Sequence, residues 1–384
     1  MDPKQNRMQP IDVDFRSGEF LTLGVEVEAQ LIDWRNQELC PAATRILPLC
    51  QGENITAEIF QSMIEISTGI CRSLAEVDRD LSRARAALLA ACESVGVEVV
   101  GAGTHPFSRR GERLIFPAPR YRTLIDRNQW IARRLTIFGL HVHIGARSGD
   151  HAMQLANGLM AHLGTLLALS ASSPYIEGHF TGLHSARSTV FESQPTAGSP
   201  PSFADWQSFT DHVERLTRCE AIESLKDLWW DIRPNPSYGT VEIRICDGTA
   251  RPCETLALVA LIQCLAAWID EQIAVGCPPP APALWRLREN KWRAARWGLE
   301  ANLILDDEGR WAPMREVVQD LLDRLKPWAR KLNCQEYLLP LQLVLEDRGS
   351  VHRQRRIYQQ TRSLQAVVQA LAREWRSDEI VEHL

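Results

Sequence analysis

Pairs of ionisable residues two positions apart are the parts of this 384-residue chain best suited to chemistry. Glu26 and Glu28 lie in a segment where they alternate with valines. Residues two apart on a β-strand project in the same direction, about 6–7 Å apart. Two carboxylates at that distance repel each other unless a cation or an arginine lies between them. The pair therefore predicts a strand face that binds a cation or carries arginines.

The same arrangement recurs in two more segments. His141 and His143 alternate with aliphatic residues, and so do Glu242 and Arg244 within 240–246. A sheet with one solvated face would explain any single strand, because antiparallel sheets often have such a face. Three strands with clustered Glu, His and Arg are harder to explain that way. Together they favour a functional face, and glutamate oxygens are typical ligands of a hard metal ion.

Two further glutamates and one more arginine lie near these strands in sequence. The segment 56–69 contains Glu58 and Glu65, which would share a face if the segment were helical. Its apolar content and the Thr68-Gly69 pair instead favour strands with a bend, and the spacing alone leaves both readings open. Arg233 lies in a proline-containing segment that we expect to form a rigid turn before the third strand. A planar guanidinium close to these carboxylates would suit phosphate.

The elements that position these residues follow from the spacing of apolar residues. The spacing predicts strands at 20–32, 97–100, 140–144 and 240–246, and helices at 74–95, 119–134, 150–170, 203–217 and 254–273. After about residue 283 the chain is predicted to be helix or loop, with Arg353, Arg355 and Arg356 on a solvated helix face. Because the strands are unevenly spaced, the pattern favours an α+β fold over the regular alternation of a doubly wound sheet.

Composition narrows the function classes. The chain is 45% hydrophobic and 24% charged, as expected of a soluble globular protein. Its formal charge of −5 gives no electrostatic reason to expect binding to nucleic acid or to an anionic membrane. The ten cysteines include no Cys-x-x-Cys pair, and Cys71, Cys92, Cys246 and Cys264 lie in apolar patterns. They are expected to be reduced thiols in the core.

Targeting and common catalytic motifs are not found in the sequence. Residues 1–7 lack the apolar run of a signal peptide. The apolar stretch 255–269 is shorter than the roughly 18 residues of a membrane span, so a buried helix and a cytoplasmic location are expected. No phosphate-binding P-loop, zinc-protease His-Glu-x-x-His or Gly-x-Ser-x-Gly nucleophile motif is present. Gly101 and Gly103 do not begin a dinucleotide-binding fingerprint, because position 106 is proline.

A set of ordered motifs resembles the carboxylate–amine ligase family, often described as glutamate–cysteine ligase type 2. The resemblance runs from about residue 20 to about residue 360. The motifs are Gly24-Val-Glu-Val-Glu28, Ser62-Met-Ile-Glu65 with Thr68-Gly69, Gly139-Leu-His-Val-His-Ile-Gly145, Leu169-Ser-Ala-Ser-Ser-Pro174 with Thr181-Gly182 and Ser185, Trp230-Asp-Ile-Arg-Pro234, Gly239-Thr-Val-Glu-Ile-Arg244 and Glu289-Asn-Lys-Trp-Arg-Ala-Ala-Arg296.

The resemblance implies one catalytic domain over 1–384 with a mostly helical part after about 283. Its fold would be glutamine-synthetase-like, with a curved, mainly antiparallel sheet, helices packed on one side, and Mg²⁺ and ATP on the concave face. The implied metal ligands are Glu26, Glu28, Glu58, Glu65, Glu242 and His141. His141, His143 and Arg233 would face the cofactor, with His143 supporting His141, and Arg233 and Arg244 would face phosphate and substrate. Many relatives have an acidic residue and an aromatic residue where this chain has Val27 and Ala29. Val27 is expected on the aliphatic face, so the metal ligands are retained, whereas Ala29 is expected to change packing and leaves the shape of the substrate open.

The function implied by the resemblance is ATP- and Mg²⁺-dependent joining of the γ-carboxyl group of glutamate to an amine such as cysteine. A carboxylate is a poor electrophile, so the family first makes an acyl phosphate, a step that depends on positioning and electrostatics. The expected partners are an amino acid and ATP, and a homodimer remains open. The alternatives are a metal-dependent hydrolase or kinase on the same fold, or a non-catalytic nucleotide-binding protein. ADP release that requires both an acid and an amine separates the first reading from the others.

Overall fold

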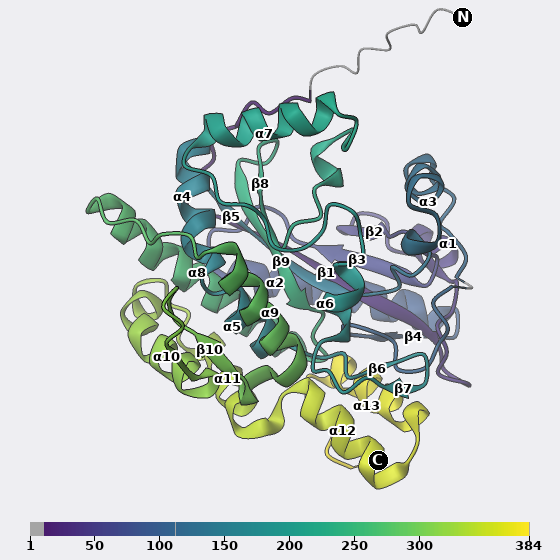
Figure 1. Cartoon of the computed structure of the whole chain (residues 1–384). Helices are drawn as coiled ribbons and strands as arrows, with labels where there is room; N and C mark the ends of the chain where they lie inside the picture. Colours follow the sequence, from purple (N-terminus) through teal and green to yellow (C-terminus); the bar gives the residue numbers. More distant parts are fainter. Residues whose placement is uncertain (1–10, 112, 384) are drawn as a thin grey trace, which may run out of the picture.

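The computed structural model describes residues 11–111 and 113–383, and a seven-stranded sheet lies at its centre (Figure 1). The strand order is β2-β3-β1-β5-β9-β8, and β4 pairs with the C-terminal end of β1, Gln30–Asp33. Every strand pairing within the described residues of this sheet is antiparallel. The strands are β1 (Leu23–Asp33), β2 (Ile55–Ala57), β3 (Met63–Ser67), β4 (Val97–Val100), β5 (Gly139–Gly145), β8 (Ile232–Asn235) and β9 (Thr240–Asp247).

Side-chain alternation along β1 gives this sheet two different faces. Val25 and Val27 are buried on one face, whereas Glu26 and Glu28 project from the other and remain partly accessible. The aliphatic face joins a large core formed with helices α2 (Leu74–Ser94), α4 (Gly149–Met160), α5 (Leu163–Ser170) and α8 (Pro252–Ala274). Burial of this apolar area is the main stabilising contribution and leaves the polar face free for function. The predicted α+β fold with a mainly antiparallel sheet is confirmed. Most of the helical core lies on the aliphatic face as expected, but α3 and α6 border the polar face.

Helix α8 lies in the middle of this core. Within the described residues it is the single helix long and apolar enough to cross a membrane, and 83% of its most apolar stretch is buried inside the structure. Helices α4 and α5 are long and apolar enough only when they are counted as one helix, and the chain bends by 61° between them. The burial of α8 is that of a core helix, as predicted for 255–269. The separation of α4 from α5 corrects the single helix expected at 150–170.

Two ambiguous segments form strands. The segment with Glu58 and Glu65 contains β2 and β3, so the strand reading is right and the helical one is wrong. Arg233 does not lie in a turn but on β8, which pairs along its whole length with β9. Antiparallel pairing needs only a short connection between the two strands. The turn between the two strands runs from Pro236 to Gly239, so it begins at the last residue of the expected turn segment, 229–236.

The remaining helices surround the sheet, and the C-terminal part is mostly helical as expected (Figure 1). A small hairpin, β10–β11, was not predicted, because three-residue strands carry too little alternation to detect. A second short hairpin is formed by β6 and β7. The bounds are α1 (Ala43–Ile46), α3 (Pro119–Ala132), β6 (Tyr175–Ile176), β7 (His179–Phe180), α6 (Ala186–Phe191), α7 (Trp206–Arg218), α9 (Leu284–Trp297), β10 (Asn302–Ile304), β11 (Trp311–Pro313), α10 (Met314–Lys331), α11 (Pro340–Leu343), α12 (Ser350–Thr361) and α13 (Leu364–Ser377).

Arg353 contradicts the expectation of a solvated face. It is 2% exposed and its guanidinium is held between Glu254 of α8 and Glu374 of α13, with nitrogen–oxygen distances of 2.6 and 2.7 Å. An arginine buried between two carboxylates ties the C-terminal helices to the core, and a charge run cannot reveal such partners. The four cysteines expected in the core are all buried as free thiols. Residues 1–7, expected to lack a signal peptide, lie outside the described residues.

Candidate active site

The polar face of the sheet forms the floor of a cavity of about 710 Å³. Strands β1, β3, β5, β8 and β9 contribute the floor, and residues of α3 and α6 contribute the walls. All of the predicted site residues line this cavity: Glu26, Glu28, Glu58, Glu65, His141, His143, Arg233, Glu242 and Arg244. Side-chain alternation explains the shared face on each strand, and antiparallel pairing brings the four segments together.

Glu26 is the centre of the first group of side chains. It lies directly opposite His141 across β1 and β5, and His141 Nδ1 is 3.2 Å from Glu26 Oε2. His143 Nε2 is 3.4 Å from the other oxygen of Glu26, while its Nδ1 is 3.0 Å from Thr240 Oγ1. Burial alone would raise the pKa of Glu26, but hydrogen bonds from the two histidines lower it below its usual range. Glu26 is therefore an ionised carboxylate between the two histidines.

The surroundings of His141 favour its neutral form. Burial, reinforced by the charge of Arg244, lowers the pKa of the imidazole below its ordinary value. A neutral imidazole keeps one nitrogen available as a ligand or acceptor. His141 lies between the two sets of glutamates, so that nitrogen is available to both.

Glu28, Glu65 and Glu58 form a second group in which like charges face one another. Glu28 and Glu65 are direct cross-strand partners on β1 and β3. Burial and the neighbouring glutamates, Glu58 first, raise the pKa of Glu65 well above its ordinary value. Burial and the charge of Glu28 raise the pKa of Glu58 to about 7. Arg120 is 3.9 Å from Glu58 but is largely exposed, so the group has an excess of buried negative charge.

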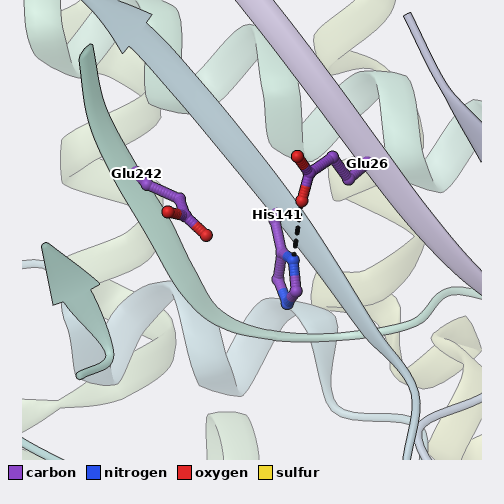
Figure 2. A group of neighbouring side chains, drawn as sticks. All are labelled: Glu26, His141 and Glu242. Carbon is purple, nitrogen blue, oxygen red and sulfur yellow. Dashed lines mark hydrogen bonds and ion pairs between the residues drawn. The ribbon is translucent and has the colours of Figure 1, made fainter. Parts of the chain in front are cut away.

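Two sets of ligand atoms on this floor are close enough to hold a metal ion. The atoms of Glu26, His141 and Glu242 lie within 4.8 Å of one another, and Figure 2 shows the three side chains on neighbouring strands. Glu28, Glu65 and His141 form the other set, and their ligand atoms also lie within 4.8 Å of one another. Glu58 lies in the same cavity but belongs to neither set. A donor set dominated by carboxylate oxygens matches the preference of Mg²⁺.

Glu242 also binds both predicted arginines. Arg233 Nε is 2.9 Å from Glu242 Oε2, and Arg244 Nη1 donates to Oε1 of the same carboxylate. Arg233 is fixed further by the carbonyl groups of Leu225 and Leu228, at 3.2 and 2.8 Å. Burial alone would raise the pKa of Glu242, but the two arginines lower it well below its ordinary value. The arginines thus lie in the cavity, beside the candidate metal ligands.

Several residues that line the cavity were not predicted. Arg187 and Phe191 of α6, Tyr121 of α3, and Trp229 form the walls around the Glu28 end. Arg187 follows a recognised Thr-Gly and Ser motif by two residues, which was the available signal. Tyr121 and Phe191 lie on helices and Trp229 lies just before β8, and their sequence positions gave no sign that they line a cavity.

A buried ion pair outside the cavity supports the arginine-bearing strand. Lys291 of α9 is 2.7 Å from both oxygens of Asp231, and the two residues are 3% and 1% exposed. The Asp231 carbonyl accepts a hydrogen bond from the backbone N–H of Arg244. This pair gives a structural reason for two of the motifs, those around Asp231 and Lys291.

The sequence matches the family described as glutamate–cysteine ligase family 2 over residues 22–372. A protein of Bdellovibrio bacteriovorus is 43% identical over 94% of this chain and 97% of its own length. A protein of Gloeobacter violaceus is 42% identical over 93% and 97%. Both carry the name "Putative glutamate–cysteine ligase 2".

Solved structures share the fold at low sequence identity. A glutamate–cysteine ligase of Francisella tularensis in complex with AMP has a TM-score of 0.68 at 12% identity, over 95% of this chain and 90% of that one. A bifunctional glutathione synthetase of Pasteurella multocida has a TM-score of 0.66 at 14% identity, over 93% and 52%. The fold implied by the resemblance is therefore confirmed. Together with the family match, these findings show that the chain belongs to glutamate–cysteine ligase family 2, as an enzyme of the carboxylate–amine ligase class.

Proposed function

We propose that the protein is an ATP- and Mg²⁺-dependent ligase that joins the γ-carboxyl group of glutamate to an amine, such as cysteine, through an acyl phosphate. The observation that carries this proposal is the pair of ligand sets that share His141 on the floor of one cavity. Two adjacent carboxylate-rich sets could hold cations, and together with the two arginines these cations would balance the negative charge of a nucleoside triphosphate. The AMP in the Francisella structure supports adenine-nucleotide use within this fold.

The residues present fit magnesium. Glu26, Glu28, Glu65 and Glu242 would hold it, with His141 between the two sets. The raised pKa of Glu65 indicates a site that lacks positive charge, which a divalent cation would supply. When bound, Mg²⁺ would supply positive charge that favours transfer of the terminal phosphoryl group. Glu58 would add negative charge beside these ligands without binding the metal directly.

The remaining residues position the reactants and stabilise charge. Arg233 and Arg244 would bind the phosphoryl oxygens on the side of Glu242, because the guanidinium fork matches such an anion. Two carbonyl groups hold Arg233 in place, so its side chain would need to move little during the reaction. His141 and His143 hold Glu26 in one orientation. No side-chain nucleophile is needed, since the carboxylate of the substrate itself attacks ATP.

Product identity tests this mechanism. Turnover should give ADP and inorganic phosphate, whereas an adenylating ligase would give AMP and pyrophosphate. Glutamate labelled with ¹⁸O in its γ-carboxyl group should pass one label to phosphate as the amide forms. Reactions that lack either the acid or the amine serve as controls. AMP as product, or unlabelled phosphate during amide synthesis, would contradict the acyl phosphate.

The same assay separates the alternative functions. ADP release without any amine would favour a hydrolase or a kinase, and nucleotide binding without turnover of any acid would favour a non-catalytic protein. A panel of amines is needed to identify the second substrate, because the aromatic walls of the cavity do not by themselves select one amine. The reaction uses ATP and free amino acids, so we also expect the protein to act in the cytoplasm.

A further inference from the structure

A second cavity, of about 370 Å³, lies between α6 and α9, which are neighbours in the fold (Figure 1). Among the described residues, none lines both this second cavity and the active-site cavity. Arg187 and Phe191, four residues apart on α6, line the active-site cavity. Ser188 and Thr189 of the same helix line the second one, together with the 197–199 loop. The two cavities therefore lie against different faces of α6.

Two side chains of opposite charge line the second cavity without pairing with each other. Glu192, directly after α6, has a side chain that is 43% exposed, and Arg288 of α9 is exposed as well. Within the described residues, no carboxylate lies within 4.0 Å of the Arg288 guanidinium. Since both charges line one cavity, the space between them can take a molecule that carries an ammonium group and a carboxylate.

Lys291 makes this cavity unsuited to an anion alone. Its ammonium group is 3% exposed and lies 2.7 Å from both oxygens of Asp231 and 2.7 Å from Glu192 Oε1. An ammonium group has three N–H donors, so all of them are used. Lys291 thus holds one oxygen of Glu192 in place and has no donor left for a ligand. A phosphate or a carboxylate alone would be repelled by Glu192, whereas an ammonium group would be attracted to it.

Polar and apolar groups beside these charges suit the rest of a small molecule. Ser199 Oγ is buried at the cavity wall and has no hydrogen-bond partner in the described structure. Such a group is costly unless another molecule pairs with it. Trp292, four residues after Arg288 on α9, is 46% exposed and offers an aromatic surface beside the guanidinium. The volume of the cavity is within the range of small-molecule sites.

We infer that the second cavity binds the zwitterionic head group of an α-amino acid, with its carboxylate on Arg288 and its ammonium group on Glu192. Charge-assisted hydrogen bonds of this kind are the stronger ones in proteins. The inference goes beyond the proposed function, because the ligand lies outside the active-site cavity and its binding needs no turnover. Free amino acids carry this head group. A γ-glutamyl amide also carries it, because the amide keeps the α-amino and α-carboxyl groups of glutamate, so the test distinguishes these two sources.

Fluorine NMR of the protein labelled with fluorotryptophan reports on each cavity separately. Trp292 lines the second cavity and Trp229 lines the active-site cavity, and Trp292→Phe and Trp229→Phe assign their signals. The probes are L-glutamate, L-cysteine and γ-glutamylcysteine, each added up to about 10 mM, which would fill most of a site with a Kd of about 1 mM. At least one probe should shift the Trp292 signal in a saturable way. A shift with the free amino acids assigns them as ligands, and a shift with the dipeptide alone assigns the γ-glutamyl amide.

Removal of each charge tests the two contacts. Arg288→Gln and Glu192→Gln should each weaken the binding seen at Trp292 by roughly 10- to 100-fold, and the Trp229 response should stay as in the wild type. The N-acetylated form of the probe that binds has lost its ammonium charge, so it should bind at least roughly 10-fold more weakly. Arg288 has no ion pair to lose and Glu192 is half-exposed, so both variants should fold, which thermal melting checks.

Arg293→Gln is the matched control. Arg293 lies on the same helix, pairs with Glu289 at 2.8 Å and does not line the second cavity, so this variant should keep the wild-type response at Trp292. A Trp292 signal that none of the three probes shifts would overturn the inference. A shift that survives both Arg288→Gln and Glu192→Gln would also overturn it, because the signal would then come from the active site. A silent Trp229 signal would count against the proposed function alone, because Trp292 reports on the second cavity independently.

Discussion

Arg233 and Glu242 face each other directly across β8 and β9, with Arg233 Nε 2.9 Å from Glu242 Oε2. Arg244, two residues further along β9, binds the other oxygen of the same carboxylate. Glu242 is 1% exposed, so three charges are desolvated together. A carboxylate held from two sides in this way is both a structural counter-ion and a candidate metal ligand.

Glu242→Gln should strongly destabilise the metal-free protein. The change leaves two buried guanidinium groups without their counter-ion, and breaking a buried pair typically costs about 3 to 5 kcal/mol. Urea unfolding in the presence of EDTA measures the change in the free energy of unfolding. Glu19→Gln is the control, because the Arg72–Glu19 pair is exposed and should contribute less than about 1 kcal/mol. Equal effects of the two substitutions would contradict the structural role of Glu242.

Glu65→Gln should have opposite effects on stability with and without magnesium. Without the metal, it removes a buried charge from a group of like charges, so stability should stay the same or rise. With saturating MgCl₂, the wild-type protein should gain thermal stability by mass action, and the variant should lose most of that gain. Differential scanning fluorimetry measures both. Glu98→Gln is the control, because Glu98 lies on β4 outside the cavity. If Mg²⁺ raised the melting temperature of the Glu65 variant as much as that of the wild type, Glu65 would not be a metal ligand.

Magnesium binding should release protons near neutral pH. The pKa of Glu58, raised to about 7 by burial and by Glu28, means that the metal-free protein holds a proton there, and a nearby cation favours its release. Calorimetry in buffers of different ionisation enthalpy should show release near pH 7 that disappears at clearly higher pH. In the metal-free protein, the stabilising contribution of this proton falls as pH rises from about 4.5 to about 7, because the unfolded state has already lost it. Glu58→Gln should reduce both effects.

Arg244→Lys should lower kcat by roughly 100-fold, the size expected when one preorganised donor to a developing charge is lost. Lysine keeps the positive charge but cannot offer two coplanar donors. Steady-state kinetics with ADP detection gives kcat, and thermal melting reports any loss of stability. Arg72→Lys, at an exposed pair, is the control. An unchanged kcat in a folded Arg244→Lys protein would mean that Arg244 only neutralises Glu242.

His105 should contribute to acid unfolding. It is buried, its Nε2 bonds to the Gln37 carbonyl at 2.9 Å, and its Nδ1 accepts the backbone N–H of Ser108 at 3.0 Å. Burial lowers the pKa of His105 to about 3, so the folded state stays neutral while the unfolded state takes up a proton below about 6.5. Stability should therefore fall as the pH drops below that value. His105→Gln should reduce proton uptake on unfolding by about one, and His179→Gln, at an exposed position, should leave it unchanged.

Much of the site was readable from local patterns. Alternation along 20–32 and 240–246 placed Glu26, Glu28, Glu242 and Arg244 on polar faces, because the side chains of a strand point to opposite sides whatever its neighbours are. Helix α2 was predicted from apolar residues at helical spacing, and α8 from its long apolar run. Short elements were not, since a three-residue strand such as β10 has no period to detect.

The tertiary structure decided which of these faces meet. Cross-strand register places His141 opposite Glu26 and Glu65 opposite Glu28, and no local pattern contains that pairing. It also decided the charge states, because the pKa of Glu58 depends on burial and on Glu28, thirty positions earlier in the chain. Arg187 and Arg353 show the limit most clearly. Among the residues that the structure describes, Arg187 has no carboxylate within ion-pair distance, whereas Arg353 has two. A local pattern records which side a residue faces, whereas counter-ions and burial come from segments far apart in the chain that only folding brings together.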